Sequence, residues 1–239
     1  MAKHKLTFLG HAAWRLTTAE GKVIIFDPFL TPNPLTPEGE KRQTRCDVMA
    51  LTHGHIDHTS DALQVYRETG CKIVSIIELC TILQKMGVKE EDLLPANTGG
   101  TVEVEGIKFI LVPACHSSST QFDERLEYAG KPLGFVVELP DGLTIYNSGD
   151  TWIFEEMKYI KRLWRPTIGI LCIGGHFTMD AKAAALAAKE LLELKTVICQ
   201  HYGTFPVLTD TPDDLRRELE GSGIEVLSPQ PGETIEIGE

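Results

Sequence analysis

The chain has 239 residues and a formal net charge of −11, and 42% of its residues are hydrophobic. That length and composition are sufficient for a well-buried core, whereas the acidic excess disfavours nucleic acid as a partner because like charges repel. No apolar run approaches the roughly 20 residues that cross a bilayer, and the run after Lys5 is interrupted at Gly10, so we expect neither a membrane span nor a signal peptide. The six cysteines form no CxxC pair, which favours reduced core thiols in a cytoplasmic protein.

The first half of the chain predicts an antiparallel meander followed by alternating helices and strands. A proline-rich segment at 27–45 is predicted to be a long loop that walls a pocket. A short apolar strand then ends in a burst of histidines. In chain order the predicted elements are strands at 5–9, 12–17, 23–26 and 47–51, a helix from about 60 to 68, a strand at 72–76 and a helix at 78–86.

The second half repeats this order, because two hairpins precede a helix, strand, helix, strand and helix. The predicted hairpins are 102–104 with 107–112 and 135–139 with 143–146, followed by a helix from 154, a strand at 167–173, a helix at 180–194, a strand at 196–199, a helix at 212–220 and a final strand pair. Two such halves predict an α+β fold in which two sheets pack face to face with helices outside. We expect one domain spanning 1–239.

The strongest functional signal is the HxHxDH run that extends from His53 to His58. It places three imidazoles and one carboxylate within six residues, directly after an apolar strand. Imidazole nitrogen and carboxylate oxygen are typical ligands of Zn²⁺ and similar ions. Residues two apart on an extended loop share a side, whereas the next pair begins a helix, so the run can supply two metal ions. A solvent-exposed polar loop is the weaker interpretation.

Three further candidates follow predicted strands, namely His116, Asp150 and His201. Taken singly, each is more typical of a cap or turn residue, and their order along the chain is what carries the argument. His11 and His176 stand beside glycines at predicted strand ends, so each could approach a ligand closely, and a catalytic role for each is weighed against a turn histidine. Thr204 and Tyr202, beside His201, are weaker candidates for hydrogen bonds to ligands.

HxHxDH, a later histidine, an aspartate in a Gly-Asp-Thr turn and a final histidine together resemble the metallo-β-lactamase superfamily over nearly the whole chain. The segments 10–12, 27–29, 174–179 and 200–204 look like the UPF0173-like branch of metal-dependent hydrolases, which is related to L-ascorbate-6-phosphate lactonase. The resemblance implies an αββα sandwich with mixed sheets. It also implies a first metal on His53, His55 and His116, a second on Asp57, His58 and His201, and Asp150 bridging the two. Many relatives carry a histidine where Asn147 stands, so no role is assigned to that residue.

These expectations describe a hydrolase in which two divalent ions activate water. Zn²⁺ is the default for this ligand set, and the lactonase relatives suggest Mn²⁺ instead. Asp57, His176 and His11 are the expected catalytic residues. The two cations attract anions, so a small anionic ester, lactone or phosphodiester is the expected substrate. His55 stands where di-iron relatives carry a carboxylate, which favours hydrolysis over redox chemistry.

Two alternatives are a nuclease of the same superfamily and a non-catalytic metal-binding protein. The nucleases usually carry basic docking domains, which do not fit in this length, and a non-catalytic relative is expected to have lost ligands, whereas all seven are present here. Specificity is expected in the loops 28–45 and 117–131. Their apolar residues can serve a homo-oligomer interface as readily as a pocket, so the oligomeric state is open.

Overall fold

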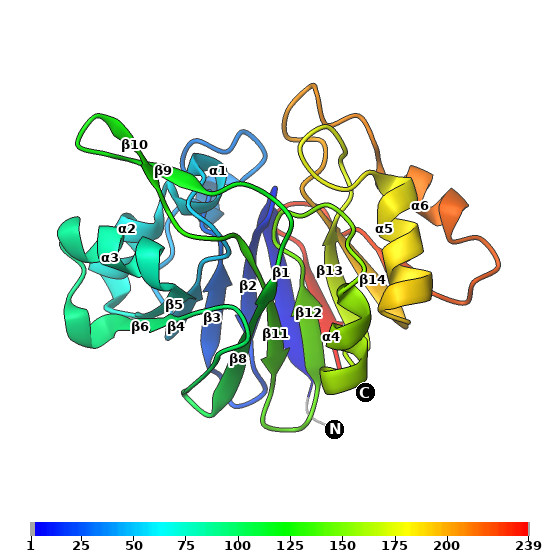
Figure 1. Ribbon diagram of the computed structural model, residues 1–239, viewed down its shortest axis with the longest axis horizontal. Helices are drawn as coiled ribbons and strands as arrows, with labels where there is room; N and C mark the ends of the chain where they lie inside the picture. Colours follow the sequence, from blue (N-terminus) through cyan, green and yellow to red (C-terminus); the bar gives the residue numbers. More distant parts are fainter. Residues whose placement is uncertain (1–2, 239) are drawn as a thin grey trace.

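Two seven-stranded mixed sheets packed against each other form the centre of the computed structural model, which describes residues 3–238 (Figure 1). In spatial order the first sheet contains β16 (Thr234–Ile237), β1 (His4–Gly10), β2 (Ala13–Thr17), β3 (Val23–Phe26), β4 (Val48–Ala50), β5 (Lys72–Ile76) and β6 (Leu93–Ala96). The second contains β15 (Glu225–Leu227), β14 (Thr196–Gln200), β13 (Ile168–Cys172), β12 (Thr144–Asn147), β11 (Leu133–Glu138), β8 (Ile107–Pro113) and β7 (Thr101–Val104).

Helices cover the outer face of each sheet, as expected for an αββα sandwich (Figure 1). The helices beside the first sheet are α1 (Ile56–Thr59), α2 (Ala62–Thr69) and α3 (Ile77–Lys85), and those beside the second are α4 (Met157–Trp164), α5 (Ala181–Leu186) and α6 (Pro212–Glu218). Short 3-10 turns lie at Glu38–Glu40 and Glu90–Asp92. No helix among residues 3–238 is long and apolar enough to cross a membrane. The predicted fold class is therefore confirmed.

Each sheet changes from antiparallel to parallel pairing along its width. β1, β2 and β3 form the predicted meander, and β3 to β6 continue in parallel. In the second sheet the β7–β8 and β11–β12 hairpins precede the parallel strands β12 to β15. The carboxyl ends of parallel strands meet at one edge of a sheet, and the loops that follow β4, β12 and β14 gather there.

The final strand pair was predicted wrongly, because its two strands join different sheets. β15 pairs with β14 in the second sheet, whereas β16 pairs with β1 in the first. The crossing is fixed by two backbone hydrogen bonds at Phe8, which donates to Glu233 O and accepts from Gly232 N. The chain therefore closes by linking the sheets at their edges, which local hydrophobic pattern does not reveal.

The segment 117–131, predicted to be a loop, contains a hairpin of β9 (Ser119–Phe122) and β10 (Arg125–Tyr128). It projects from the body of the molecule above α1 and α2 (Figure 1). Asp123 and Glu124 adopt positive φ angles at its turn, of 48° and 61°. Glycine or asparagine is the usual signal for such a turn, and neither occupies these positions, which explains why the sequence did not reveal it.

One feature of the helical layer also departs from the prediction, and the apolar residues of the two predicted loops differ in exposure. The helix predicted over 180–194 is α5 followed by a π-helical turn at Ala187–Leu191, and the Asp180 side chain caps it by accepting a hydrogen bond from Ala183 N. Phe29 and Leu30, considered as pocket or interface residues, are buried. Leu126 of the same set is exposed on β10.

Candidate metal centre

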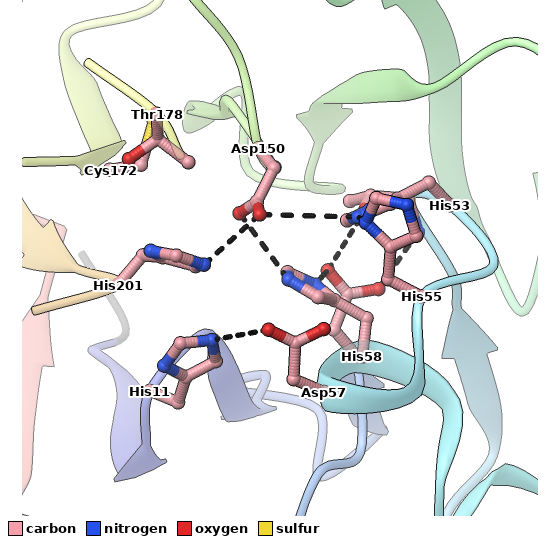
Figure 2. Close-up of polar contacts among 12 residues, drawn as sticks. His11, His53, His55, Asp57, His58, Asp150, Cys172, Thr178 and His201 are labelled. Atoms are coloured by element: carbon pink, nitrogen blue, oxygen red, sulfur yellow. Dashed lines mark hydrogen bonds and ion pairs between the residues drawn. The ribbon is translucent and has the colours of Figure 1, made fainter. Parts of the chain in front are cut away.

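The HxHxDH run lies at the carboxyl end of β4, where the chain passes from strand to helix. His53 and His55 lie in the extended segment, and α1 begins at Ile56, so Asp57 and His58 project from its first turn. The remaining predicted ligands come from the second sheet: His116 follows β8, Asp150 follows β12 and His201 follows β14. Figure 2 shows the HxHxDH side chains, Asp150 and His201 converging from both sheets on one spot, and His116 Nε2 lies 3.6 Å from Oδ2 of Asp150.

Asp150 lies at the centre of this cluster. Its Oδ2 is 3.0 Å from Nε2 of His201 and 3.6 Å from Nε2 of His116. Its Oδ1 is 3.3 Å from Nε2 of His58, and Nε2 of His53 is 4.0 Å from Oδ2 (Figure 2). One carboxylate thus contacts imidazoles from both halves of the molecule, the geometry that a bridging ligand requires.

The donor atoms form three overlapping groups, in each of which all atoms lie within 4.8 Å of one another. The groups are His53 with His55 and His116; His11 with Asp57, His58 and His201; and His53 with His58 and Asp150. The structure thus brings all seven predicted ligands together in the predicted sets, with Asp150 between them. It also adds His11 to the second set.

Unpartnered buried atoms show that this donor set fits a cation. Nε2 of His58 and Oδ1 of Asp150 are buried and make no hydrogen bond with any residue among 3–238. The two atoms lie 3.3 Å apart without hydrogen-bonding geometry, and a buried polar atom that makes no hydrogen bond is costly. Groups of three or four imidazole nitrogens and carboxylate oxygens suit Zn²⁺ and related first-row ions, so the residues present fit the expected metals.

Asp27, to which the sequence assigned no role, orients two of the histidines. It lies at the end of β3, and its Oδ2 accepts hydrogen bonds from His58 Nδ1 at 2.9 Å and from Thr52 Oγ1 at 2.6 Å. Since the Thr52 hydroxyl donates to Asp27, its oxygen accepts from Nδ1 of His53 at 3.0 Å. Both imidazoles therefore carry a proton on Nδ1, which makes Nε2 of each ring the nitrogen that faces the cluster and that would bind a metal.

The cluster combines neutral imidazoles with an ionised carboxylate, a combination that suits a cation site. Burial lowers the pKa values of His53, His55 and His116, so these imidazoles are neutral near pH 7. Burial acts in the same direction on His58, but the carboxylates of Asp150 and Asp27 raise its pKa well above the usual value. Burial would raise the pKa of Asp150, but the adjacent imidazoles hold it well below its usual range.

His11 contacts the second ligand set directly. It is fully buried, with Nε2 3.2 Å from Oδ2 of Asp57 and Nδ1 2.9 Å from Oγ1 of Thr204. Burial and the nearby His201 lower the pKa of His11 to about 4, so the ring is neutral at physiological pH. Thr204, considered only as a weak candidate, thus holds the far side of this imidazole.

His176 and Cys115 occupy exposed positions. His176 lies in the loop after β13 with φ of 60°, packs against Phe177, and belongs to none of the three donor groups found among residues 3–238. Its catalytic role remains a prediction. Cys115, expected to be a core thiol, is exposed beside His116 because its backbone pairs with Trp152 at the rim of the cluster. The other five cysteines are buried and free.

A buried network of hydrogen bonds fixes the strand ends that carry Asp150 and His201. Asn147 Oδ1 accepts hydrogen bonds from Gly149 N at 3.0 Å and from Gln200 Nε2 at 3.1 Å, and Gln200 Oε1 accepts from Trp14 Nε1 at 3.0 Å. These contacts tie β12 and β14 to β2 of the other sheet. Gln200 immediately precedes His201, so the network holds the strand ends that carry two ligands. Position at a strand end was the available signal for Asn147 and Asp27, whereas nothing local marked Gln200.

Comparisons with known proteins agree with this geometry. A family model described as a beta-lactamase superfamily domain matches residues 5–201. A UPF0173 metal-dependent hydrolase from Koribacter versatilis is 43% identical over 96% of this chain and 97% of its own length, and one from Methanosarcina mazei is 40% identical over 99% and 100%.

Solved structures of the same fold are also found. Igni18, a metallo hydrolase from Ignicoccus hospitalis, superposes with a TM-score of 0.86, at 35% identity and 99% coverage of both chains. A possible metal-dependent hydrolase from Veillonella parvula, at 22% identity and a TM-score of 0.75, covers 98% of this chain and 99% of its own and shares the fold. The chain belongs to the beta-lactamase superfamily and, within it, to the UPF0173 metal-dependent hydrolases.

Proposed function

We propose that this chain hydrolyses a small anionic ester, lactone or phosphodiester at a centre of two divalent ions, with Zn²⁺ as the first candidate and Mn²⁺ as the alternative. The observation that carries the proposal is the position of Asp150 between two sets of donor atoms, each large enough to hold one ion. His53, His55 and His116 would hold the first ion, and Asp57, His58 and His201 the second. Bound there, divalent ions supply Lewis-acid charge that acidifies water and polarises a substrate oxygen.

The protein contributes preorganised ligands. Asp27 fixes the tautomers of His58 and, through Thr52, of His53, so that their Nε2 atoms face the centre. Neutral imidazoles are the metal-binding form of histidine, and burial keeps His53 in that form by lowering its pKa. The chain therefore needs little rearrangement to bind metal.

The substrate approaches from the side on which the ligands are partly exposed. His55, Asp57 and His116 are partly accessible to solvent, whereas His53, His58 and Asp150 are buried. Two bound dications would outweigh the carboxylates of Asp57, Asp150 and the adjacent Asp27, leaving a net charge of about +1 that attracts an anion. This favours an anionic substrate although the chain as a whole is acidic.

His11 and His176 complete the proposed catalytic residues. His11 is neutral, contacts Asp57 at 3.2 Å, and is fixed by Thr204, so it orients that carboxylate by donating a hydrogen bond from Nε2. His176, on the exposed loop after β13, is proposed to orient the substrate or donate a proton to the leaving group. Free cysteines favour a cytoplasmic location as part of the same proposal.

Hydrolysis of model substrates tests the proposal. The metal-stripped chain and chains reconstituted with Zn²⁺ or Mn²⁺ would be assayed against lactones, p-nitrophenyl esters and bis-p-nitrophenyl phosphate. Turnover that depends on the added ion is the expected result. A fully reconstituted chain that hydrolyses no member of the three classes would contradict the proposal.

A further inference from the structure

Large apolar side chains are exposed on segments that carry or adjoin the ligand residues. Ile56 is 66% exposed, Phe177 is 56% exposed and Trp152 is 53% exposed. Exposed apolar residues scattered singly over a surface need no explanation, but several around one site mark a binding surface. Here they occur on three separate segments: Ile56 begins α1, Trp152 follows Asp150, and Phe177 lies in the loop after β13.

Ile56 lies between two of the partly exposed ligands, His55 and Asp57, as the first residue of α1. Its side chain is also part of the wall of a cavity of about 90 Å³ beneath β9. Most of that wall is apolar and comes from α2, α3 and the residue after it: Leu63, Leu79, Ile82, Leu83 and Met86. Ile56 therefore connects the turn that carries His55 and Asp57 to an apolar cavity in the body of the protein.

Trp152 flanks the centre next to the third partly exposed ligand. Its backbone N donates to Cys115 O at 3.0 Å, which places it beside His116, and it follows Asp150 by two residues. Phe177 belongs to the neighbouring loop, because Met179 N donates to the carbonyl of Thr151 at 2.9 Å. Two aromatic side chains are thus held on the side of the centre that the second sheet provides.

We infer that the substrate carries an apolar group of several carbon atoms, alkyl or aryl, which packs against Ile56, Trp152 and Phe177 while its reacting bond lies at the metal centre. This inference rests on the proposed function and adds the part of the substrate that does not react. Ile56 lies between two partly accessible ligands and Trp152 pairs with the residue before a third, which favours a small molecule that reaches the metal centre as the occupant. Burial of each methylene against such a surface favours binding about fourfold.

A chain-length series separates this inference from the proposed function. p-Nitrophenyl acetate, butyrate, hexanoate and octanoate would be compared with the metal-loaded chain. We expect kcat/KM to rise by about fourfold per methylene over the first few carbons. Hydrolysis that does not depend on chain length would overturn the inference and leave the proposed function standing.

Substitutions test whether Trp152 and Phe177 form the surface that causes the dependence on chain length. Trp152→Ala and Phe177→Ala are expected to reduce the ratio of the octanoate kcat/KM to the acetate kcat/KM by about tenfold. Leu163 of α4 is 67% exposed and lies away from the ligand-bearing loops, so Leu163→Ala is the matched control and should keep the wild-type ratio. Equal ratios in Trp152→Ala and Leu163→Ala would overturn the assignment. Thermal unfolding of each variant checks that the fold is intact.

A binding measurement covers the case in which no ester is hydrolysed. Trp152 is exposed whereas Trp14 is buried and Trp164 is partly buried, so its fluorescence reports on this surface. Octanoate is expected to give a saturable change in the metal-loaded chain that acetate does not give and that Trp152→Phe removes. That result without turnover would contradict the proposed function alone, and no change with octanoate would overturn the inference.

Dimers of the wild type that Trp152→Ala converts to monomers would also overturn the inference, because the surface would then be a subunit interface.

Discussion

The carboxylate of Asp27 accepts a hydrogen bond from Nδ1 of His58 at 2.9 Å, and both side chains are buried. This contact joins the end of β3 to the first turn of α1 and fixes which nitrogen of His58 carries the proton. Because Asp27 holds the proton of Nδ1, Nε2 is the nitrogen that faces Asp150 and that would bind a metal. A residue that binds no metal itself therefore determines whether a ligand is ready to bind one.

Replacement of Asp27 by Asn should reduce metal affinity by about 10- to 100-fold, because a neutral amide no longer imposes one tautomer on His58. Competition with a chromophoric chelator measures this affinity. Asp61→Asn is the matched control, since buried Asp61 instead accepts hydrogen bonds from Leu30 N and Thr31 N in the adjoining loop. Equal losses of affinity in the two variants would show that Asp27 acts only on the fold.

Replacement of Asp57 by Ala should remove one equivalent of metal and nearly all hydrolysis. Asp57 is the one carboxylate in the group that also contains His11, His58 and His201, so its loss leaves that group without an anionic donor. Metal analysis and steady-state kinetics measure the two effects. Asp123→Ala, on the exposed β9–β10 turn, is the control. Full turnover in a variant that lacks one metal would contradict the two-ion mechanism.

The stability of the metal-free chain should fall as the pH decreases from about 6.5. The pKa of His11 is lowered to about 4 in the folded chain, so the unfolded chain takes up a proton at His11 from about pH 6.5 downwards and the folded chain does not. Proton uptake by the unfolded state favours unfolding, by about 2 kcal/mol at pH 5. Urea unfolding in the presence of a chelator measures this loss. His11→Gln should lose about 2 kcal/mol less over that range, and an equal loss would contradict the assigned shift.

Replacement of Gly174 by Ala should destabilise the protein by about 1–3 kcal/mol and weaken metal binding. A Cβ atom at this position would lie 2.2 Å from the carbonyl oxygen of His201, so the backbone that carries this ligand must move. Gly39 has no atom within 4 Å of an added Cβ, and Gly39→Ala should change stability by less than about 0.5 kcal/mol. Thermal unfolding compares the two variants. A Gly174→Ala variant as stable as Gly39→Ala would contradict the packing at His201.

Replacement of His176 by Ala should leave the metal content unchanged and slow turnover by about a hundredfold. His176 belongs to none of the three donor groups found among residues 3–238, so metal binding should not change. Its exposed loop is held next to Asp150 by the hydrogen bond from Met179 N to Thr151 O, so the side chain can act on the substrate. Metal analysis and kcat measure both effects. Unchanged kinetics would show that His176 is a turn residue without a catalytic role.

Much of the fold and of the site could be predicted because the sequence patterns are local. The strands Val23–Phe26 and Lys72–Ile76 have the predicted bounds, since continuous apolar runs with clear turn signals mark them. The HxHxDH run was equally informative, because it concentrates ligands within one strand-to-helix turn. His116, Asp150 and His201 were found only from their order along the chain, and the structure brings them to the same spot.

The features that escaped prediction depend on contacts between distant residues. β16 pairs with β1 across almost the whole length of the chain, and the β9–β10 turn uses Asp123 and Glu124 in place of the usual glycine. Asp27 acts on a histidine that lies 31 residues further along the chain, and nothing in its local sequence indicates the partner. Such long-range contacts are set by packing of the two sheets and not by local propensity.

The metal stoichiometry of the reconstituted chain tests the central claim most directly. Metal-stripped protein would be incubated with excess Zn²⁺, or in parallel with Mn²⁺, freed of unbound ions and analysed by inductively coupled plasma mass spectrometry. The shared position of Asp150 predicts about two ions per chain, falling to about one in Asp57→Ala. A chain that retains no metal, or one ion regardless of the presence of Asp57, would contradict the assignment of two sites.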